Sequence, residues 1–279
     1  MIVDAHHHLW DPVRHAYPWM DGDELAPLRR AYTVDDLWEV TDGRVAHTIL
    51  VQTIGDAAET AGFLAVASAN DGLIKGVVGW VDLAAPDVSN QIAALRAGPG
   101  GARLVGIRHQ VQDEPDPRWL ARPEVIRGLR AVAAAGLTYD LLVRGPQVDV
   151  AIEVAAGLPE LTFALDHLAK PEIAAGEWEP WASRLARIAT LPNVSAKLSG
   201  LVTEARWDDW DAARIAPYAR HALDVFGAER LMYGSDWPVC TLAASYGEVW
   251  ELAGTLVKGL SEAERAAILG GTAQRVYRL

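Results

Sequence analysis

Cysteine is almost absent from the sequence, because Cys240 is the single one among 279 residues. One thiol cannot form a disulfide within the chain, so nothing indicates an oxidising compartment. Long apolar runs are also missing, and no stretch has the length that a membrane-spanning helix needs. Since no signal-peptide pattern precedes Asp4, we expect a cytoplasmic protein with no membrane partner.

Basic residues are scarce relative to acidic ones. The chain has 25 Lys and Arg against 37 Asp and Glu, which gives a formal net charge of −12 at pH 7. Binding to nucleic acid needs a basic face for the phosphates, and this composition does not supply one. The expected partner is therefore a small molecule, and the acidic balance keeps the protein soluble, either as a monomer or as a homo-oligomer.

Glycine-rich phosphate loops are lacking as well. Neither a G-x-G-x-x-G pattern nor a P-loop follows any strand-like run of the chain. This absence weakens the case for a nucleotide-binding protein built on a doubly wound open sheet.

What the chain does have is a regular alternation of two patterns. It is 51% hydrophobic, and eight apolar, strand-like runs alternate with helical periodicities. Runs of Val, Ile, Leu and Ala must be covered on both faces, which favours parallel strands with crossover helices. The pattern predicts a single-domain (β/α)8 TIM barrel over residues 1–279, with a doubly wound sheet as the alternative. The predicted strands begin at Val3 and then span residues 45–53, 73–81, 104–111, 137–143, 161–167, 194–201 and 231–237.

The predicted helices are delimited by their end signals. Helix 123–135 opens with proline and stops before Gly136, and helix 212–226 stops before Gly227. Ser261 and Glu264 form a capping box that opens the C-terminal helices. The remaining predicted helices span residues 57–70, 149–157, 181–190 and 246–258.

Three consecutive histidines close the first predicted strand, in Val-Asp-Ala-His-His-His-Leu-Trp at residues 3–10. Side chains alternate along a strand, so we expect Asp4, His6 and His8 to share one face and His7 to point the other way. His6 and His8 can then converge on one metal ion or one bound water. A purification tag and a purely structural role are the alternative interpretations.

In a barrel the reacting groups lie where the strands end, so polar residues at those positions are the candidates. Asp236 ends the last strand and can exchange a proton with water or bind a metal, the alternative being a helix cap or an Asx turn. His167 ends the sixth strand, with Asp166 expected to point away from it, and a satisfied core histidine is the alternative. Arg108 offers a fork for a carbonyl or hydroxyl oxygen, unless it forms a buried salt bridge.

Tryptophans and polar side chains near the strand ends are candidate substrate-binding groups. Aromatic rings can support a sugar ring, although packing alone is the alternative for each of them. A long loop at residues 17–23 is typical of lids and binding loops. The substrate-binding candidates are Trp10, Trp19, Gln52, Trp80, Lys197 and Trp237, with Lys170 and Glu204 as further residues that could reach inward.

Several motifs spread over the whole chain resemble those of one family. They are DAHHHLWDP at 4–12, YPWM at 17–20, VVGWVDL at 77–83, GIRHQVQDEPDPRWL at 106–120, DHLAKP at 166–171, KLSGLVTEA at 197–205 and GSDWPVC at 234–240. Together they resemble the amidohydrolase superfamily, and within it the sugar-lactonase branch of the L-fuconolactonase and L-rhamnono-lactonase kind. The resemblance implies a (β/α)8 barrel, His6 and His8 on the first strand, His167 on the sixth, and Asp236 as acid/base on the eighth.

The resemblance does not specify how many metal ions the site holds or whether the reaction needs one. No lysine or glutamate suited to bridging two metals ends the fourth strand, where Arg108 stands, and no histidine ends the fifth. A binuclear centre is therefore not expected. His6, His8 and Asp236 could hold one divalent ion, with zinc as the expected metal, and a reaction that needs no metal is the alternative.

The predicted function is hydrolysis of a sugar lactone of the L-fucono or L-rhamnono type. Asp236 would activate a water that attacks the lactone carbonyl. Either His167 with Arg108, or a metal on His6 and His8, would stabilise the oxyanion. Two alternatives from other classes are a metal-dependent decarboxylase and a sugar-binding barrel without catalysis.

Overall fold

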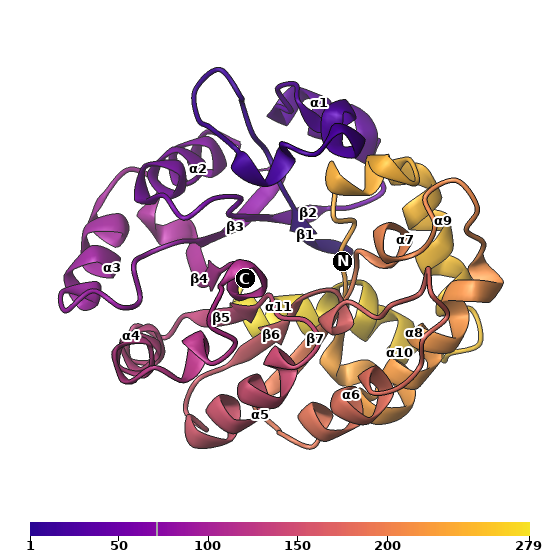
Figure 1. The fold of residues 1–279 in the computed structure, drawn as a ribbon. Coiled ribbons are helices and arrows are strands. Elements are labelled where there is room, and N and C mark those ends of the chain that lie inside the picture. Colours follow the sequence, from indigo (N-terminus) through magenta and orange to yellow (C-terminus); the bar gives the residue numbers. More distant parts are fainter. Residues whose placement is uncertain (71) are drawn as a thin grey trace.

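Eight parallel strands in sequential order form the centre of the molecule, as Figure 1 shows in a view onto the strands and their ring of helices. The structure is a computed structural model, and it describes residues 1–70 and 72–279. Each strand pairs in parallel with the next one along the chain, as the sequence predicted. The strands are β1 (Val3–His7), β2 (His47–Val51), β3 (Ile74–Gly79), β4 (Leu104–His109), β5 (Thr138–Leu141), β6 (Phe163–Leu165), β7 (Val194–Leu198) and β8 (Leu231–Tyr233).

The sheet closes between β1 and the segment that follows β8. The backbone N–H of His8 donates to the Trp237 carbonyl at 2.7 Å, and the N–H of Asp236 donates to the His6 carbonyl at 2.8 Å. A parallel bridge also joins His7 and Trp237. Because the last strand region pairs with the first, the sheet is a nearly closed barrel, and the doubly wound alternative is wrong. The eighth strand itself is shorter than predicted, since it ends at Tyr233.

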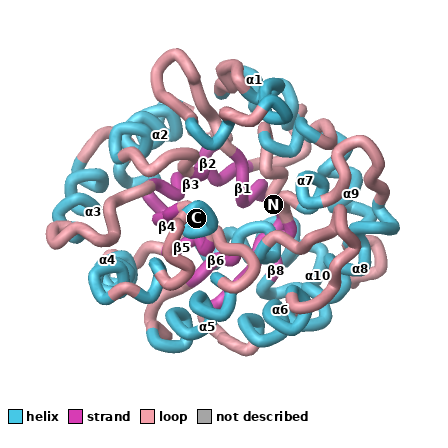
Figure 2. The backbone as a smooth tube through the Cα atoms, in the orientation of Figure 1, coloured by secondary structure: helices cyan, strands magenta, loops and turns pink. Residues whose placement is uncertain are grey.

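Helices surround the strands, as the tube of Figure 2 shows. The predicted helices are found within two residues at each end, and side-chain caps open several of them, including the predicted Ser261–Glu264 capping box. Three helices, α1, α3 and α7, were not predicted. The helices are α1 (Val34–Thr41), α2 (Ala57–Ala69), α3 (Val88–Ala97), α4 (Pro123–Ala134), α5 (Gln147–Gly157), α6 (Trp181–Ala189), α7 (Leu201–Glu204), α8 (Ala212–Phe226), α9 (Tyr246–Leu256), α10 (Glu262–Ala266) and α11 (Thr272–Tyr277).

The C-terminal helix α11 closes one end of the barrel. Its residues Ala273, Val276 and Tyr277 pack into one buried cluster with Val3 and Ala5 of β1. Val3 is the first residue of its strand, so this plug lies at the amino ends of the strands. The carboxyl ends are left for a site, as is usual in such barrels. Among the described residues, no helix is both long enough and apolar enough to cross a membrane.

One expectation about β1 is wrong. The strand has an irregular register between Asp4 and His7, which shifts the alternation of its side chains. Asp4 therefore faces the helix layer, where its carboxylate accepts a hydrogen bond from Tyr246 of α9 at 3.1 Å. His6 faces the barrel interior, and His7 points outward to the Thr48 hydroxyl at 2.9 Å, as predicted.

Candidate active site

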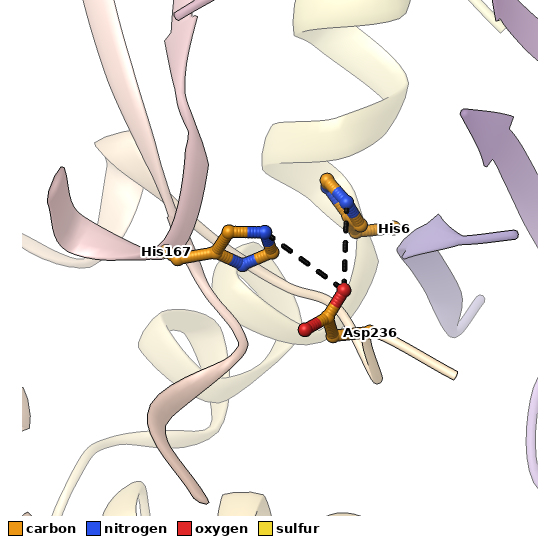
Figure 3. A group of neighbouring side chains, drawn as sticks. All are labelled: His6, His167 and Asp236. Atoms are coloured by element: carbon orange, nitrogen blue, oxygen red, sulfur yellow. Dashed lines mark ion pairs between the residues drawn. The ribbon is translucent and has the colours of Figure 1, made fainter. Parts of the chain in front are cut away.

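Three histidines converge on the Asp236 carboxylate at the carboxyl ends of the strands. Its Oδ1 atom lies 3.5 Å from His8 Nε2, 3.7 Å from His6 Nε2 and 3.8 Å from His167 Nε2. Figure 3 shows His6 and His167 pointing toward the carboxylate from different elements. The four residues come from β1, the end of β6 and the end of β8, so groups about 230 positions apart in the sequence meet at one end of one barrel.

The backbone after β6 explains how His167 reaches this site. His167, Leu168, Ala169 and Lys170 all have φ between 51° and 59°, so four consecutive non-glycine residues adopt the left-handed conformation. This conformation costs roughly 1–2 kcal/mol for each such residue. The Trp181 indole holds the turn by donating to the Leu168 carbonyl at 2.7 Å.

The left-handed turn also corrects the expectation that Asp166 points away from His167. Because the chain turns sharply after Asp166, both side chains lie at the barrel interior. Asp166 accepts a hydrogen bond from Arg108 at 3.0 Å and contacts Lys197 at 2.9 Å. His167 contacts Asp236 on the other side of the same turn. Asp166 is thus part of the site's framework.

Asp236 also has a left-handed backbone, with φ of 57°. Its N–H donates to the His6 carbonyl, and its own carbonyl accepts from Cys240 N at 2.9 Å. Within residues 1–70 and 72–279, no backbone N–H donates to the Asp236 side chain, so the structure gives no support to a cap or an Asx turn. The carboxylate is instead available to the three imidazoles.

Burial and neighbouring charges set the protonation of these groups at neutral pH. Burial lowers the pKa of His167 to about 4. Burial and the charge of Lys197 hold the pKa of His6 well below its ordinary value. Burial would raise the pKa of Asp236, but His167 and His8 together lower it below its ordinary value. The site therefore combines neutral imidazoles with an ionised carboxylate.

Arg108 is fixed beneath this cluster. Its Nε donates to Gln52 Oε1 at 2.9 Å, and its Nη1 donates to Asp166 at 3.0 Å. A second guanidinium nitrogen donates to the Gln52 backbone carbonyl. Arg108 thus forms the buried salt bridge considered as an alternative, while it also lines the cavity described next. Gln52 orients Arg108 and does not line that cavity.

Lys197 lies in the barrel interior and is fully buried. Its ammonium contacts Asp140 at 2.5 Å, Asp166 at 2.9 Å and His6 Nδ1 at 3.0 Å. Tyr277 of α11 donates to the same Asp140 carboxylate at 2.9 Å. Lys197 was predicted from the sequence to bind substrate, but the network was not predicted, because the position of a lysine within an apolar strand does not reveal its partners.

A cavity of about 110 Å³ opens above the cluster. Its lining includes His8, Arg108, His167, Lys170 and Asp236, so two of the three converging histidines and the carboxylate face it, while His6 lies below them. Among the predicted substrate-binding residues, Trp19 lines it, together with Thr53, Gln110, Gln112, Leu142 and Val239.

Among the described residues, the other tryptophans that were predicted to bind substrate do not line this cavity. Trp10 is buried and donates to the Leu28 carbonyl at 3.0 Å. Trp237 is buried with its ring edge-on to Tyr32. The Trp80 indole donates to His109 at 3.0 Å. Each of these indoles packs against protein groups, as the packing alternative describes.

The loop that carries Trp19 is held by one arginine. Trp19 belongs to a short 3-10 turn, Pro18–Met20. Arg29 donates to the carbonyls of Met20 at 2.8 Å and Asp21 at 2.7 Å. The predicted binding loop is therefore ordered against the rest of the molecule, with Trp19 at the cavity.

The cluster also fits a metal ion. His6, His167 and Asp236 each offer a ligand atom, and these atoms lie within 4.8 Å of one another. His8 Nε2 is 3.2 Å from His6 Nε2, close to the separation of about 3.3 Å expected between tetrahedral zinc ligands. Neutral imidazoles and an ionised carboxylate are the protonation states that bind a divalent metal. This group shares His6 and Asp236 with the predicted ligand set, and it contains His167 where the prediction had His8.

The tautomers of the histidines limit this fit. His8 Nδ1 lies 2.8 Å from the Val51 carbonyl, so it carries the proton and leaves Nε2 free to bind. His6 Nδ1 lies 3.0 Å from Lys197 and 3.4 Å from Asp166. His6 Nε2 is a ligand only in the tautomer in which the Nδ1 proton is donated to Asp166.

Comparison with known proteins places this site in a family. A model described as amidohydrolase matches residues 3–279. The chain belongs to the amidohydrolase family. An L-fucono-1,5-lactonase of Burkholderia multivorans is 39% identical over 99% of this chain and 96% of its own. A second L-fucono-1,5-lactonase, from Burkholderia ambifaria, is 35% identical over 99% of this chain and 95% of its own. The predicted resemblance to the sugar-lactonase branch of the amidohydrolases is confirmed.

Solved amidohydrolase structures agree with this assignment. A crystal structure of an amidohydrolase from Burkholderia multivorans with bound Zn superimposes with a TM-score of 0.93 at 38% identity, covering 100% of this chain and 99% of that chain. The 5-carboxyvanillate decarboxylase of Sphingomonas paucimobilis has a TM-score of 0.66 at 14% identity, covering 100% of this chain and 99% of that chain. The second likeness shows a shared fold alone.

Proposed function

We propose that the protein hydrolyses a sugar lactone, with an L-fucono-1,5-lactone as the first candidate substrate and an L-rhamnono-lactone as the second. The observation that carries the proposal is the convergence of three neutral imidazoles on one ionised carboxylate beside a cavity. The two L-fucono-1,5-lactonases, at 39% and 35% identity over nearly the whole chain, support the substrate class. In this proposal residues 1–279 act as one domain.

In the proposed reaction, Asp236 accepts a proton from a water molecule in the cavity. The water oxygen attacks the lactone carbonyl, and the oxyanion that forms is stabilised by Arg108 and by the His167 imidazole. Asp236 then returns the proton to the ring oxygen as the C–O bond breaks, which gives the open aldonate. If a divalent metal were held by His6, His167 and Asp236, it would replace the His167 N–H in stabilising the oxyanion, and it would also lower the pKa of a bound water.

The decarboxylase alternative has weaker support. A decarboxylase of the same fold is only 14% identical to this chain. The cations that line the cavity already have carboxylate partners: Arg108 contacts Asp166 at 3.0 Å, and Lys170 contacts Glu204 at 3.5 Å. No uncompensated cation among these is left to hold a substrate carboxylate. The alternative of a sugar-binding barrel without catalysis does not account for the ionised Asp236 at the cavity.

A pH-indicator assay of five- and six-membered aldonolactones of both series tests the proposal. We expect L-fucono-1,5-lactone to be opened with kcat/KM of about 10⁴ M⁻¹s⁻¹ or more, as is common for enzymes on their substrates. Parallel reactions with a chelator measure whether a metal is needed. Release of carbon dioxide from aromatic carboxylates, with no lactone opened, would establish the decarboxylase instead.

Zinc binding is a separate prediction, because it does not depend on turnover. We expect calorimetry to detect one zinc ion per chain. We expect His167→Gln to weaken the affinity by at least about 10-fold, since even the loss of an outer-shell partner costs that much. His47→Gln is the matched control, because His47 lies at the start of β2 and contacts the Gly72 carbonyl. Equal affinities in the two variants would remove His167 from the metal site.

A further inference from the structure

The two ring nitrogens of His167 contact different groups. Nε2 lies 3.8 Å from Asp236 Oδ1, and a dashed line in Figure 3 joins this pair. Nδ1 lies 2.8 Å from the hydroxyl oxygen of Ser199. The proposed reaction uses the Nε2 side of the ring and gives Ser199 no role. The partner of Nδ1 still matters, because a neutral imidazole carries one proton, and the nitrogen without it can only accept a hydrogen bond.

Ser199 is a buried residue that directly follows β7, with 3% of its surface exposed. Among residues 1–70 and 72–279, its hydroxyl has no hydrogen-bond partner other than His167 Nδ1. If Nδ1 carried the proton, the hydroxyl hydrogen of Ser199 would be buried without an acceptor, which costs free energy. If Nδ1 lacks the proton, the hydroxyl donates to it and both groups are paired. The contact therefore favours the tautomer in which His167 carries its proton on Nε2.

The Asp236 carboxylate favours the same tautomer from the Nε2 side of the ring. An ionised carboxylate only accepts hydrogen bonds, so it attracts an N–H and repels a nitrogen lone pair. Ser199 and Asp236 thus agree on the position of the proton. Because His167 and Asp236 both belong to the cavity lining, this N–H is placed where the oxyanion of the proposed reaction forms.

Gly200 allows the imidazole to lie this close to Ser199. Its φ of 66° is left-handed, a conformation that favours glycine. A Cβ atom at Gly200 would lie 2.6 Å from His167 Nδ1 and 2.8 Å from His167 Cγ, which is too close for non-bonded atoms. The ring of His167 therefore packs directly on the backbone of Gly200, beside the Ser199 hydroxyl. Together the two residues fix both the place of the ring and its hydrogen bond.

We propose that Ser199 is a positioning residue that, with Gly200, holds His167 as the Nε2–H tautomer and directs this N–H to the cavity. The N–H is the donor that, beside Arg108, stabilises the oxyanion in the proposed reaction. The effect on catalysis rests on the proposed function, whereas the tautomer itself is a property of the protein without substrate.

The partner of His8 shows why a hydroxyl suits this position. His8 Nδ1 faces the carbonyl of Val51 at 2.8 Å, which only accepts, so His8 keeps its proton on Nδ1. The Ser199 hydroxyl donates in the metal-free protein and can also accept. Ser199 would therefore stay paired with His167 if Nε2 became a metal ligand and the proton moved to Nδ1.

Nitrogen-15 NMR of the metal-free protein tests the tautomer without any substrate. The chain has 8 histidines, and the signals of His167 are those that His167→Gln lacks. At neutral pH we expect the proton on Nε2 and a hydrogen-bond shift on Nδ1. This shift should be lost in Ser199→Ala and kept in Ser195→Ala, a buried serine within the same strand. A wild-type proton on Nδ1, or an Nδ1 signal that Ser199→Ala leaves unchanged, overturns the proposal.

Kinetics test the consequence for catalysis. We expect kcat on L-fucono-1,5-lactone to fall about 10-fold in Ser199→Ala, the effect of one hydrogen bond of ordinary strength. KM should change by less than about 2-fold, because Ser199 acts through His167 on an oxyanion that forms only in the transition state. Ser199→Thr keeps the hydroxyl and should retain most of the wild-type kcat. Ser195→Ala should leave kcat and KM unchanged.

The outcomes separate this role from the proposed function. A loss of kcat in Ser199→Ala that Ser199→Thr restores supports the positioning role. A wild-type kcat in Ser199→Ala, a change in KM alone, or Ser199→Thr as slow as Ser199→Ala overturns it. If the wild type opens no lactone, the proposed function fails, and the nitrogen-15 signals still decide whether Ser199 sets the tautomer of His167.

Discussion

Asp236→Asn should reduce lactone hydrolysis by about 10²–10⁴-fold, which is the range that a general base contributes. The amide cannot accept the proton of the attacking water, while it keeps the size and polarity of the carboxyl group. The fold should not change, because asparagine tolerates the left-handed backbone that φ of 57° requires at this position. The backbone hydrogen bonds from Asp236 to His6 and from Cys240 to Asp236 are independent of the side chain.

The measurement for this variant is kcat/KM on the lactone that the wild type prefers, together with the melting temperature. Asp208→Asn is the matched control, because the Asp208 side chain is 80% exposed and its partner is the exposed Arg206. The control should retain wild-type rates. If Asp236→Asn turned over lactone at the wild-type rate, Asp236 would not be the base, and the mechanism would need another group at the cavity.

Much of this site could be predicted from residue type and position in a strand. Asp236 and His167 follow apolar runs, and the pair His6 and His8 ends the first one. In a parallel barrel all carboxyl ends of the strands open on one face, so such residues are brought together whatever their separation in the sequence. This prediction depends only on recognising the strands from their periodicity and on their order along the sequence.

Side-chain direction was less predictable, because it depends on local backbone geometry that alternation does not describe. An irregular register in β1 turned Asp4 to the helix layer. The left-handed turn at His167–Lys170 brought Asp166 inward against expectation. Neither segment contains a glycine that would have indicated an unusual backbone in the sequence. Contacts elsewhere, such as that of Trp181 with the Leu168 carbonyl, hold the turn, and these contacts depend on tertiary structure.

The tryptophans illustrate a second limit. Trp10, Trp80 and Trp237 all follow strands, as the candidate catalytic residues do. Position at a strand end does not distinguish a ring that lines the cavity from one that packs beside it. Trp19 lies in a loop, where no periodicity applies, yet it lines the cavity. Partner atoms in the fold decide this outcome. The indoles of Trp10 and Trp80 have acceptors within the protein, and that of Trp19 has none among the described residues.

Lys197→Met should destabilise the protein by about 3–5 kcal/mol, as expected when one partner of a buried ion pair is removed. Lys197, Asp140 and Asp166 are all fully buried. Methionine fills similar space, but it leaves the two carboxylates without their shared cation. Burial raises the pKa of Asp140 even beside Lys197, so this carboxyl can bind a proton in the variant. Burial would also raise the pKa of Asp166, and Lys197 is the main charge that holds it low.

Melting temperature and denaturant unfolding measure this effect against two comparison variants. Arg118→Met breaks a pair with Glu153 whose side chains are about 60% exposed, and it should cost less than about 1 kcal/mol. The double variant Lys197→Met with Asp140→Asn removes one of the stranded carboxylates, so it should be more stable than Lys197→Met alone. If Lys197→Met were as stable as Arg118→Met, the buried network would not hold the barrel together. A double variant no more stable than the single one would show that lost packing, and not stranded charge, causes the instability.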